Sequence, residues 1–120
     1  MKTKRTILVV DDDNNVREQA RAIFQHAGYD VTTAIDGSEA IKLLTVSDYD
    51  VVLLDIAMPK LDGLSVVDEL LKSNSAVLAH TYLLSDGDVS LLQELPVSGV
   101  IGKPFDRRVL IAEAKDCIGH

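Results

Sequence analysis

The sequence predicts an α/β fold in which a five-stranded parallel sheet is doubly wound by helices, as (βα)5. Two apolar runs, 7–10 and 51–54, do not alternate with polar residues, which is typical of strands covered on both faces. Helical periodicity fills the intervals between candidate strands, and this alternation favours a parallel sheet with helices on both sides. At 120 residues, the chain is expected to form one domain, residues 1–120.

Five strand–helix pairs are expected along the chain. The predicted strands are 7–10, 29–34, 51–54, 76–82 and 99–102. Apolar residues recur at steps of three and four between them, which predicts helices around 16–27, 40–44, 64–71, 89–95 and 110–117. Gly28 takes the C-cap position of the first helix, Asp62-Gly63 is a turn before the third, and Pro96 ends the fourth.

Composition excludes several classes of protein. The net charge of −7 disfavours binding to nucleic acid or to an anionic membrane, because both need basic patches. One cysteine, Cys117, excludes an internal disulfide framework and fits a reducing compartment. No apolar run exceeds four residues, so neither a membrane span nor a signal peptide is expected. A cytoplasmic domain is therefore expected.

The candidate functional residues follow the predicted strands, because ligands of open α/β sheets bind at the carboxyl ends of the strands. Three aspartates, at 11–13, follow the first strand, and Asp55 follows the third. Thr81 lies at the end of the fourth strand, and Lys103 comes directly after the fifth. These groups are therefore expected to converge on one edge of the sheet.

This combination of residues indicates phosphoryl chemistry. Neighbouring carboxylates repel one another and must either bind protons or a counter-ion, and hard oxygen ligands suit Mg²⁺. A metal ion, a lysine and a hydroxyl can together stabilise a phosphoryl group in transfer. Asp55 stands alone at its strand end, which makes it the candidate nucleophile. Asp13 directly precedes the first helix and is expected to be its N-cap.

Three segments resemble the receiver domain of bacterial two-component response regulators. They are ILVVDDD at 7–13, LDIAMP at 54–59 followed by Asp62-Gly63, and Lys103-Pro104-Phe105. Together these motifs are specific, and the resemblance covers nearly the whole chain. It implies the flavodoxin-like strand order 2-1-3-4-5.

The resemblance also implies a function. A sensor histidine kinase or a phosphotransfer protein would pass a phosphoryl group from a phosphohistidine to Asp55, and the change would switch binding to a downstream output protein or domain. Direct ligands of the Mg²⁺ would be Asp12, Asp55 and the backbone carbonyl of Ala57, while Asp11 would act through a metal-bound water. Such a domain catalyses only its own phosphorylation and dephosphorylation and is not otherwise an enzyme.

Two further residues would contact the phosphoryl group in such a domain. Lys103 would pair with it, and Thr81 would donate a hydrogen bond to it; Thr81 is preferred over Ser85 because its spacing from Lys103 suits one helix and one strand. Tyr82 stands where the family commonly has a small residue. Val100 stands where many members have an aromatic ring that rotates inward on activation, a movement a valine cannot make. These two departures motivate the alternative of a receiver-like protein-interaction module that no longer switches by phosphorylation. The complete set of site residues speaks against that alternative: Asp11, Asp12, Asp55, Thr81 and Lys103.

Two other classes of protein also have functional residues directly after the first strand, and both are alternatives for this sequence. A phosphatase of the haloacid dehalogenase type would use Asp11 and Asp13, but that family needs a longer chain and further motifs. A flavodoxin-like nucleotide binder would place a phosphate loop there, and three aspartates would repel a phosphate that arrives without a metal. Both functions are therefore disfavoured.

Overall fold

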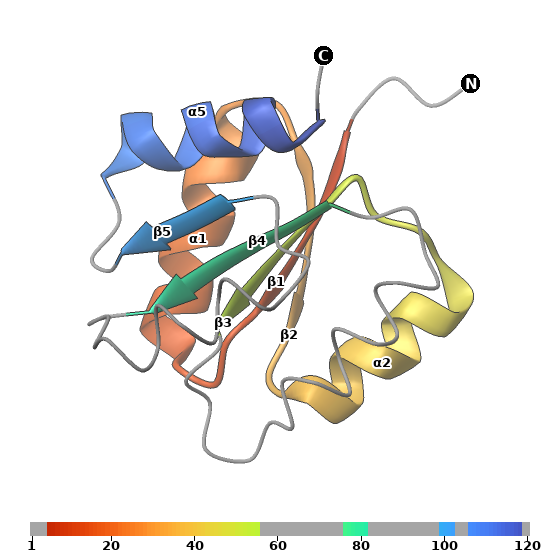
Figure 1. Cartoon of the computed structure of the whole chain (residues 1–120). Helices are drawn as coiled ribbons and strands as arrows, with labels where there is room; N and C mark the ends of the chain where they lie inside the picture. Colours follow the sequence, from red (N-terminus) through yellow and green to blue (C-terminus); the bar gives the residue numbers. More distant parts are fainter. Residues whose placement is uncertain (1–4, 56–75, 82–98, 103–105, 119–120) are drawn as a thin grey trace.

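A computed structural model describes residues 5–55, 76–81, 99–102 and 106–118, with the second and third segments described by their backbone (Figure 1). The predicted helices at 64–71 and 89–95 lie outside these residues. The described elements are, in chain order, β1 (Thr6–Val10), α1 (Asn14–His26), β2 (Asp30–Ala34), α2 (Gly37–Val46), β3 (Val51–Asp55), β4 (Ala76–Thr81), β5 (Gly99–Gly102) and α5 (Arg107–Ile118).

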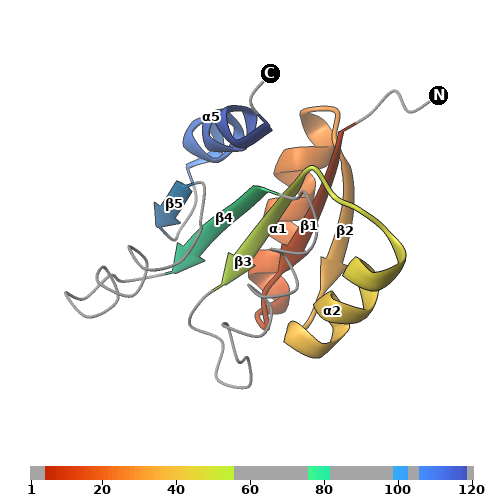
Figure 2. The same ribbon diagram turned by 45° about the vertical axis from the view of Figure 1, so that its right-hand side comes forward.

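The strands form one parallel sheet in the order β2-β1-β3-β4-β5. Helices α1 and α5 lie on one side of the sheet and α2 lies on the other (Figure 2). The predicted doubly wound α/β fold and its strand order are therefore confirmed. No helix within the described residues is long and apolar enough to cross a membrane.

The core consists of two layers that share the central strands. Alternate residues of a strand point to opposite faces, so an unbroken apolar run supplies both layers. Ile7 and Val9 of β1 pack with α1 and α5, around Phe24 and Leu110. The even-numbered residues of the same strand and of β3 pack with α2 on the opposite face. Both central strands are thus covered on two sides, as their sequence predicts.

Helix α1 is capped at both ends by local hydrogen bonds. The carboxylate of Asp13 accepts from the amide of Asn15 at 2.8 Å, which confirms its expected N-cap role. At the other end, Gly28 adopts a φ of 97°. The amide of Tyr29 then donates to the carbonyl of Phe24 at 3.0 Å, and their rings pack edge to face. This is a Schellman motif, and it uses the amide of Tyr29. Tyr29, predicted as the first residue of the strand, therefore lies outside β2, which begins at Asp30.

Cys117 serves as a small packing residue of α5. Its side chain is partly buried against the layer that contains α1. Burial raises the pKa of the thiol, and the nearby carboxylates of Glu113 and Asp116 raise it further. Both effects disfavour the thiolate form, in keeping with a structural role.

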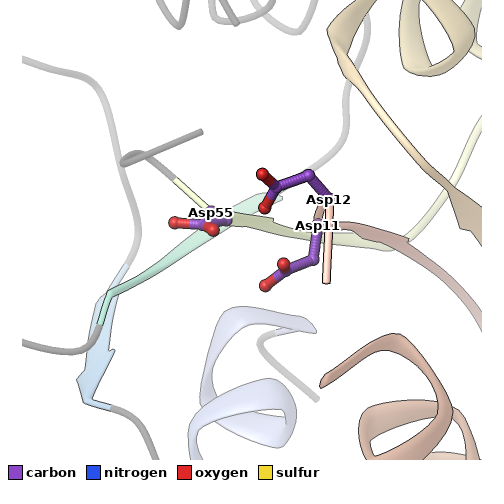
Figure 3. Close-up of side chains that lie close together, drawn as sticks. All are labelled: Asp11, Asp12 and Asp55. Carbon is purple, nitrogen blue, oxygen red and sulfur yellow. The ribbon is translucent and has the colours of Figure 1, made fainter. Parts of the chain in front are cut away.

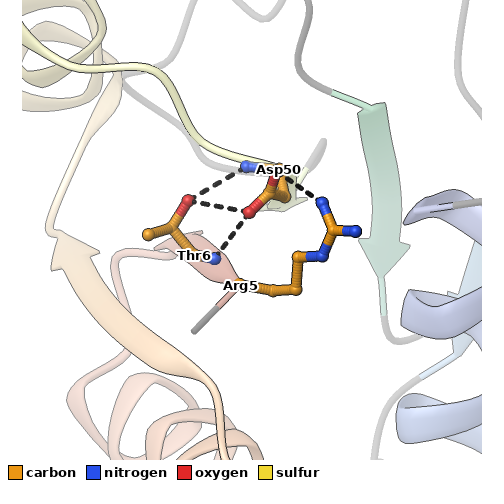
Figure 4. Close-up of polar contacts among 3 residues, drawn as sticks. All are labelled: Arg5, Thr6 and Asp50. Carbon is orange, nitrogen blue, oxygen red and sulfur yellow. Dashed lines mark hydrogen bonds and ion pairs between the residues drawn. The ribbon is translucent and has the colours of Figure 1, made fainter. Parts of the chain in front are cut away.

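The amino ends of β1 and β3 are joined by Asp50 (Figure 4). Its carboxylate Oδ2 accepts hydrogen bonds from the Thr6 amide at 2.8 Å and from the Thr6 hydroxyl at 3.2 Å. The amide of Asp50 donates in turn to the Thr6 carbonyl at 3.0 Å. The guanidinium of Arg5 lies 3.7 Å from the other carboxylate oxygen, but its side chain is 59% exposed. The hydrogen bonds to Thr6 are thus the stronger part of this contact.

We expect the Asp50→Ala variant to lose about 1–3 kcal/mol of unfolding free energy, because the half-buried Thr6 amide loses its acceptor. Arg5→Ala is expected to cost less than about 1 kcal/mol, as for other exposed ion pairs. Urea unfolding of both variants measures the difference. Equal losses would show that the ion pair, and not the hydrogen bonds, joins the strands.

Candidate functional site

The register of β1 and β3 places two aspartates side by side at the carboxyl edge of the sheet. Val10, the last residue of β1, pairs with Leu54. The residues that follow these two, Asp11 and Asp55, therefore lie next to one another. Asp55 in turn is paired with His80 of β4. The carboxyl edge is where open α/β sheets bind ligands.

Three carboxylates meet at this edge. Asp11, Asp12 and Asp55 each offer one oxygen, and these oxygens lie within 4.8 Å of one another. In Figure 3 the side chains of Asp11 and Asp12 extend from the end of β1 toward the side on which Asp55 lies. Asp11 is fully buried and Asp55 is 4% exposed, whereas Asp12 is exposed. The cluster therefore consists of two buried carboxylates and one carboxylate that faces solvent.

The backbone that carries Asp11 and Asp12 is held by hydrogen bonds. The Asp11 amide donates to the carbonyl of Ala34 in β2 at 3.2 Å. The Asp11 carboxylate accepts from the amide of Asp13 at 2.8 Å. The Asp11 carbonyl accepts from the guanidinium of Arg17 at 2.7 Å. This loop is therefore anchored to β2 on one side and to α1 on the other.

Arg17 is the residue that the sequence analysis missed. It lies near the start of α1, where the helix dipole disfavours a cation. A basic residue four residues after an N-cap aspartate is unusual, and this position could have identified Arg17 from the sequence.

Other predicted site residues are placed only in part. The backbone of Thr81 ends β4 at the same edge, one residue beyond the Asp55–His80 pair. Gly102 ends β5 beside Thr81, and the next residue, Lys103, lies outside the described residues. Ala57, Tyr82 and Ser85 also lie outside them, and Val100 is described only as a backbone position in β5.

The chemistry of the three carboxylates is that of a hard cation site. Like charges at this separation repel one another, and the two buried carboxylates have little water to screen them. A divalent cation with a preference for oxygen ligands relieves that repulsion, and Mg²⁺ and Ca²⁺ are ions of this kind. An exposed carboxylate such as Asp12 gives such an ion access from solvent.

Comparison with known families identifies a match over most of the chain. The family model of the response regulator receiver domain matches residues 7–115. The chain is 41% identical over 110 residues to a transcriptional regulatory protein CpxR homolog of Haemophilus influenzae, covering 91% of this chain and 48% of that protein. It is 35% identical over 118 residues to a probable transcriptional regulator ycf27 of Cyanidium caldarium, covering 98% and 47%. The chain thus spans about half the length of these relatives.

Solved structures of receiver domains have the same fold. The receiver domain of the Francisella response regulator 1452 superposes with a TM-score of 0.85 at 30% identity, covering 97% of this chain and 98% of that chain. The chemotaxis protein CheY4 of Vibrio cholerae superposes with a TM-score of 0.88 at 27% identity, covering 96% and 99%.

Repulsion within the cluster predicts opposite effects of two neighbouring substitutions in the absence of divalent cations. We expect Asp12→Asn to raise the unfolding free energy by about 1 kcal/mol, because it removes one of three adjacent charges. Asp13→Asn removes the same charge one residue away but keeps an N-cap oxygen, and is expected to lower stability by about 0.5 kcal/mol through the helix dipole. Unfolding in EDTA measures both.

A matched pair of this kind separates local repulsion from net charge. If both variants gain stability equally, the gain reflects the lower net charge of the whole chain. In that case the three carboxylates do not repel one another as their spacing indicates.

Proposed function

Because this chain belongs to the family of response regulator receiver domains of two-component systems, we propose that Asp55 is its phosphoacceptor and that the reaction depends on Mg²⁺. The observation that supports this assignment is the convergence of Asp11, Asp12 and Asp55 within 4.8 Å at the carboxyl edge of the sheet. A receiver domain receives a phosphoryl group, and a cluster of this composition has the ligands and the nucleophile that such a transfer needs.

The donor set fits a magnesium ion. Mg²⁺ is bound by oxygen ligands at about 2.1 Å, so two oxygens on one ion lie roughly 3–4 Å apart. The three carboxylates reach within 4.8 Å of one another before any ion draws them together. We assign Asp12, Asp55 and the carbonyl of Ala57 as direct ligands and Asp11 as a ligand through water. The ion would neutralise charge on the phosphoryl oxygens.

The transfer itself requires only a nucleophile and groups that receive charge. A carboxylate oxygen of Asp55 attacks the phosphorus of a phosphohistidine, the new P–O bond forms as the P–N bond breaks, and the imidazole leaves with the electron pair. Thr81 and Lys103 are assigned to the phosphoryl oxygens. The hydroxyl would donate a hydrogen bond and the ammonium would supply a point charge. The domain would act only on itself, with water later hydrolysing the acyl phosphate.

The partners follow from the relatives. One of them, 34% identical over 113 residues, is a CAI-1 autoinducer sensor kinase/phosphatase of Vibrio cholerae, and this chain spans 16% of it. Others are named transcriptional regulators. We propose a sensor histidine kinase or phosphotransfer protein as the donor and a protein or domain as the output, in the cytoplasm. With a net charge of −7, the chain is a poor candidate for direct contact with nucleic acid.

Acetyl phosphate tests the assignment of Asp55 without a cognate kinase. Incubation with acetyl phosphate and Mg²⁺ is expected to add one phosphoryl group that intact-mass spectrometry detects and that hydroxylamine removes, as expected for an acyl phosphate. EDTA should abolish the modification. The Asp55→Asn variant should remain unmodified, because its amide is not a nucleophile.

Asp50→Asn is the matched control, because it makes the same change at the opposite end of β3. It should be modified like the wild-type chain. Wild-type protein that stays unmodified with Mg²⁺ would instead support the receiver-like interaction module that does not switch by phosphorylation. Modification of Asp55→Asn at the wild-type rate would place the phosphoacceptor elsewhere.

A further inference from the structure

Arg17 connects helix α1 to the loop that carries the acidic cluster. Its Nη1 donates to the backbone carbonyl of Asp11 at 2.7 Å, and its Nη2 donates to the side chain of Asn14 at 3.1 Å. The two contacts use both ends of one planar guanidinium, so they orient it as well as bind it. The Arg17 side chain is half-buried, and its hydrogen bond to Asp11 is partly buried as well.

The carbonyl that Arg17 contacts belongs to the peptide that joins Asp11 to Asp12. Three consecutive peptide groups are tied at this point. The first is tied through the Asp11 amide to Ala34, and the third through the Asp13 amide to the Asp11 carboxylate. The middle peptide, which sets the angle between two of the three clustered carboxylates, is held by Arg17.

We propose that Arg17 is a positioning residue for the cation site: it fixes the Asp11–Asp12 peptide so that both carboxylates face one ion. This inference rests on the proposed Mg²⁺ site. Without the contact, the peptide can rotate, and binding an ion must first order it. Residues that orient metal ligands without contacting the metal commonly contribute to affinity, and their removal weakens metal binding about 10- to 100-fold.

Charge and geometry predict opposite results for this arginine. A guanidinium near a cation site repels the cation, so its removal tightens binding if charge alone matters. If the guanidinium holds the ligands in place, its removal weakens binding. The sign of the change in Mg²⁺ affinity therefore separates the two roles. A residue that only stabilises the fold would change the unfolding free energy and leave the affinity unaltered.

Isothermal titration with MgCl₂, without any phosphodonor, measures this affinity directly. We expect Arg17→Met to bind Mg²⁺ about tenfold more weakly than the wild-type chain. Arg17→Lys keeps the charge and one donor but loses the fork, and its affinity should lie between the two. Arg21→Met is the matched control: Arg21 lies one turn further along α1 in an exposed pair with Glu18, and its loss should leave the affinity unchanged.

Each outcome supports or overturns the proposal. Weaker binding in Arg17→Met, intermediate binding in Arg17→Lys and no change in Arg21→Met support it. Tighter binding in Arg17→Met, or unchanged binding with lower stability in urea, overturns it while the metal site stands. Should Arg17→Met fail to fold, the decision rests on Arg17→Lys, which must bind Mg²⁺ more weakly than wild type although its charge is unchanged. Absence of Mg²⁺ binding in the wild-type chain would overturn the proposed metal site and this inference with it.

Discussion

The repulsion between three carboxylates at the end of a rigid sheet is the constraint on which the rest of this site depends. The parallel register of β1 and β3 sets Asp11 beside Asp55, and Asp12 follows in the same loop. Two of the three are buried, so neither can turn into solvent to escape its neighbours. A site of this composition offers the oxygen ligands that a divalent cation prefers. A cation that accepts further oxygen ligands can also receive phosphoryl oxygens.

The fold holds this unfavourable arrangement because the strands cannot slide. Alternate side chains of β1 and β3 enter two different core layers, and a shift by one residue would exchange the layers. At the opposite end of the same strands, Asp50 and Thr6 form hydrogen bonds that fix the start of the register. The apolar core and this polar contact thus both fix the register of β1 and β3, and the register positions the carboxylates at the carboxyl edge. Arg17 adds support from α1, at the loop itself.

Much of this arrangement could be predicted from the sequence because its main signals are local. An apolar run without alternation indicates a strand buried on both faces, and an aspartate directly after it must lie at the carboxyl edge. The start of β2 was less predictable, since the Tyr29 amide is used by the end of α1. The start of α2 at Gly37 was also not predicted, although Asp36 is its N-cap and accepts from the Glu39 amide at 2.8 Å. The contact of Arg17 depends on the path of a long side chain, which periodicity does not describe.

The dependence of folding stability on Mg²⁺ tests the central claim most directly. If the carboxylate cluster binds the ion only in the folded state, the unfolding free energy of the wild-type chain should rise by about 1.4 kcal/mol for each tenfold increase in free Mg²⁺ above the dissociation constant. Urea unfolding across a MgCl₂ series, compared with NaCl at matched ionic strength, measures this slope. Identical unfolding free energies in the two salts would show that Mg²⁺ acts only by general screening of charges. That result would contradict a cation site at Asp11, Asp12 and Asp55.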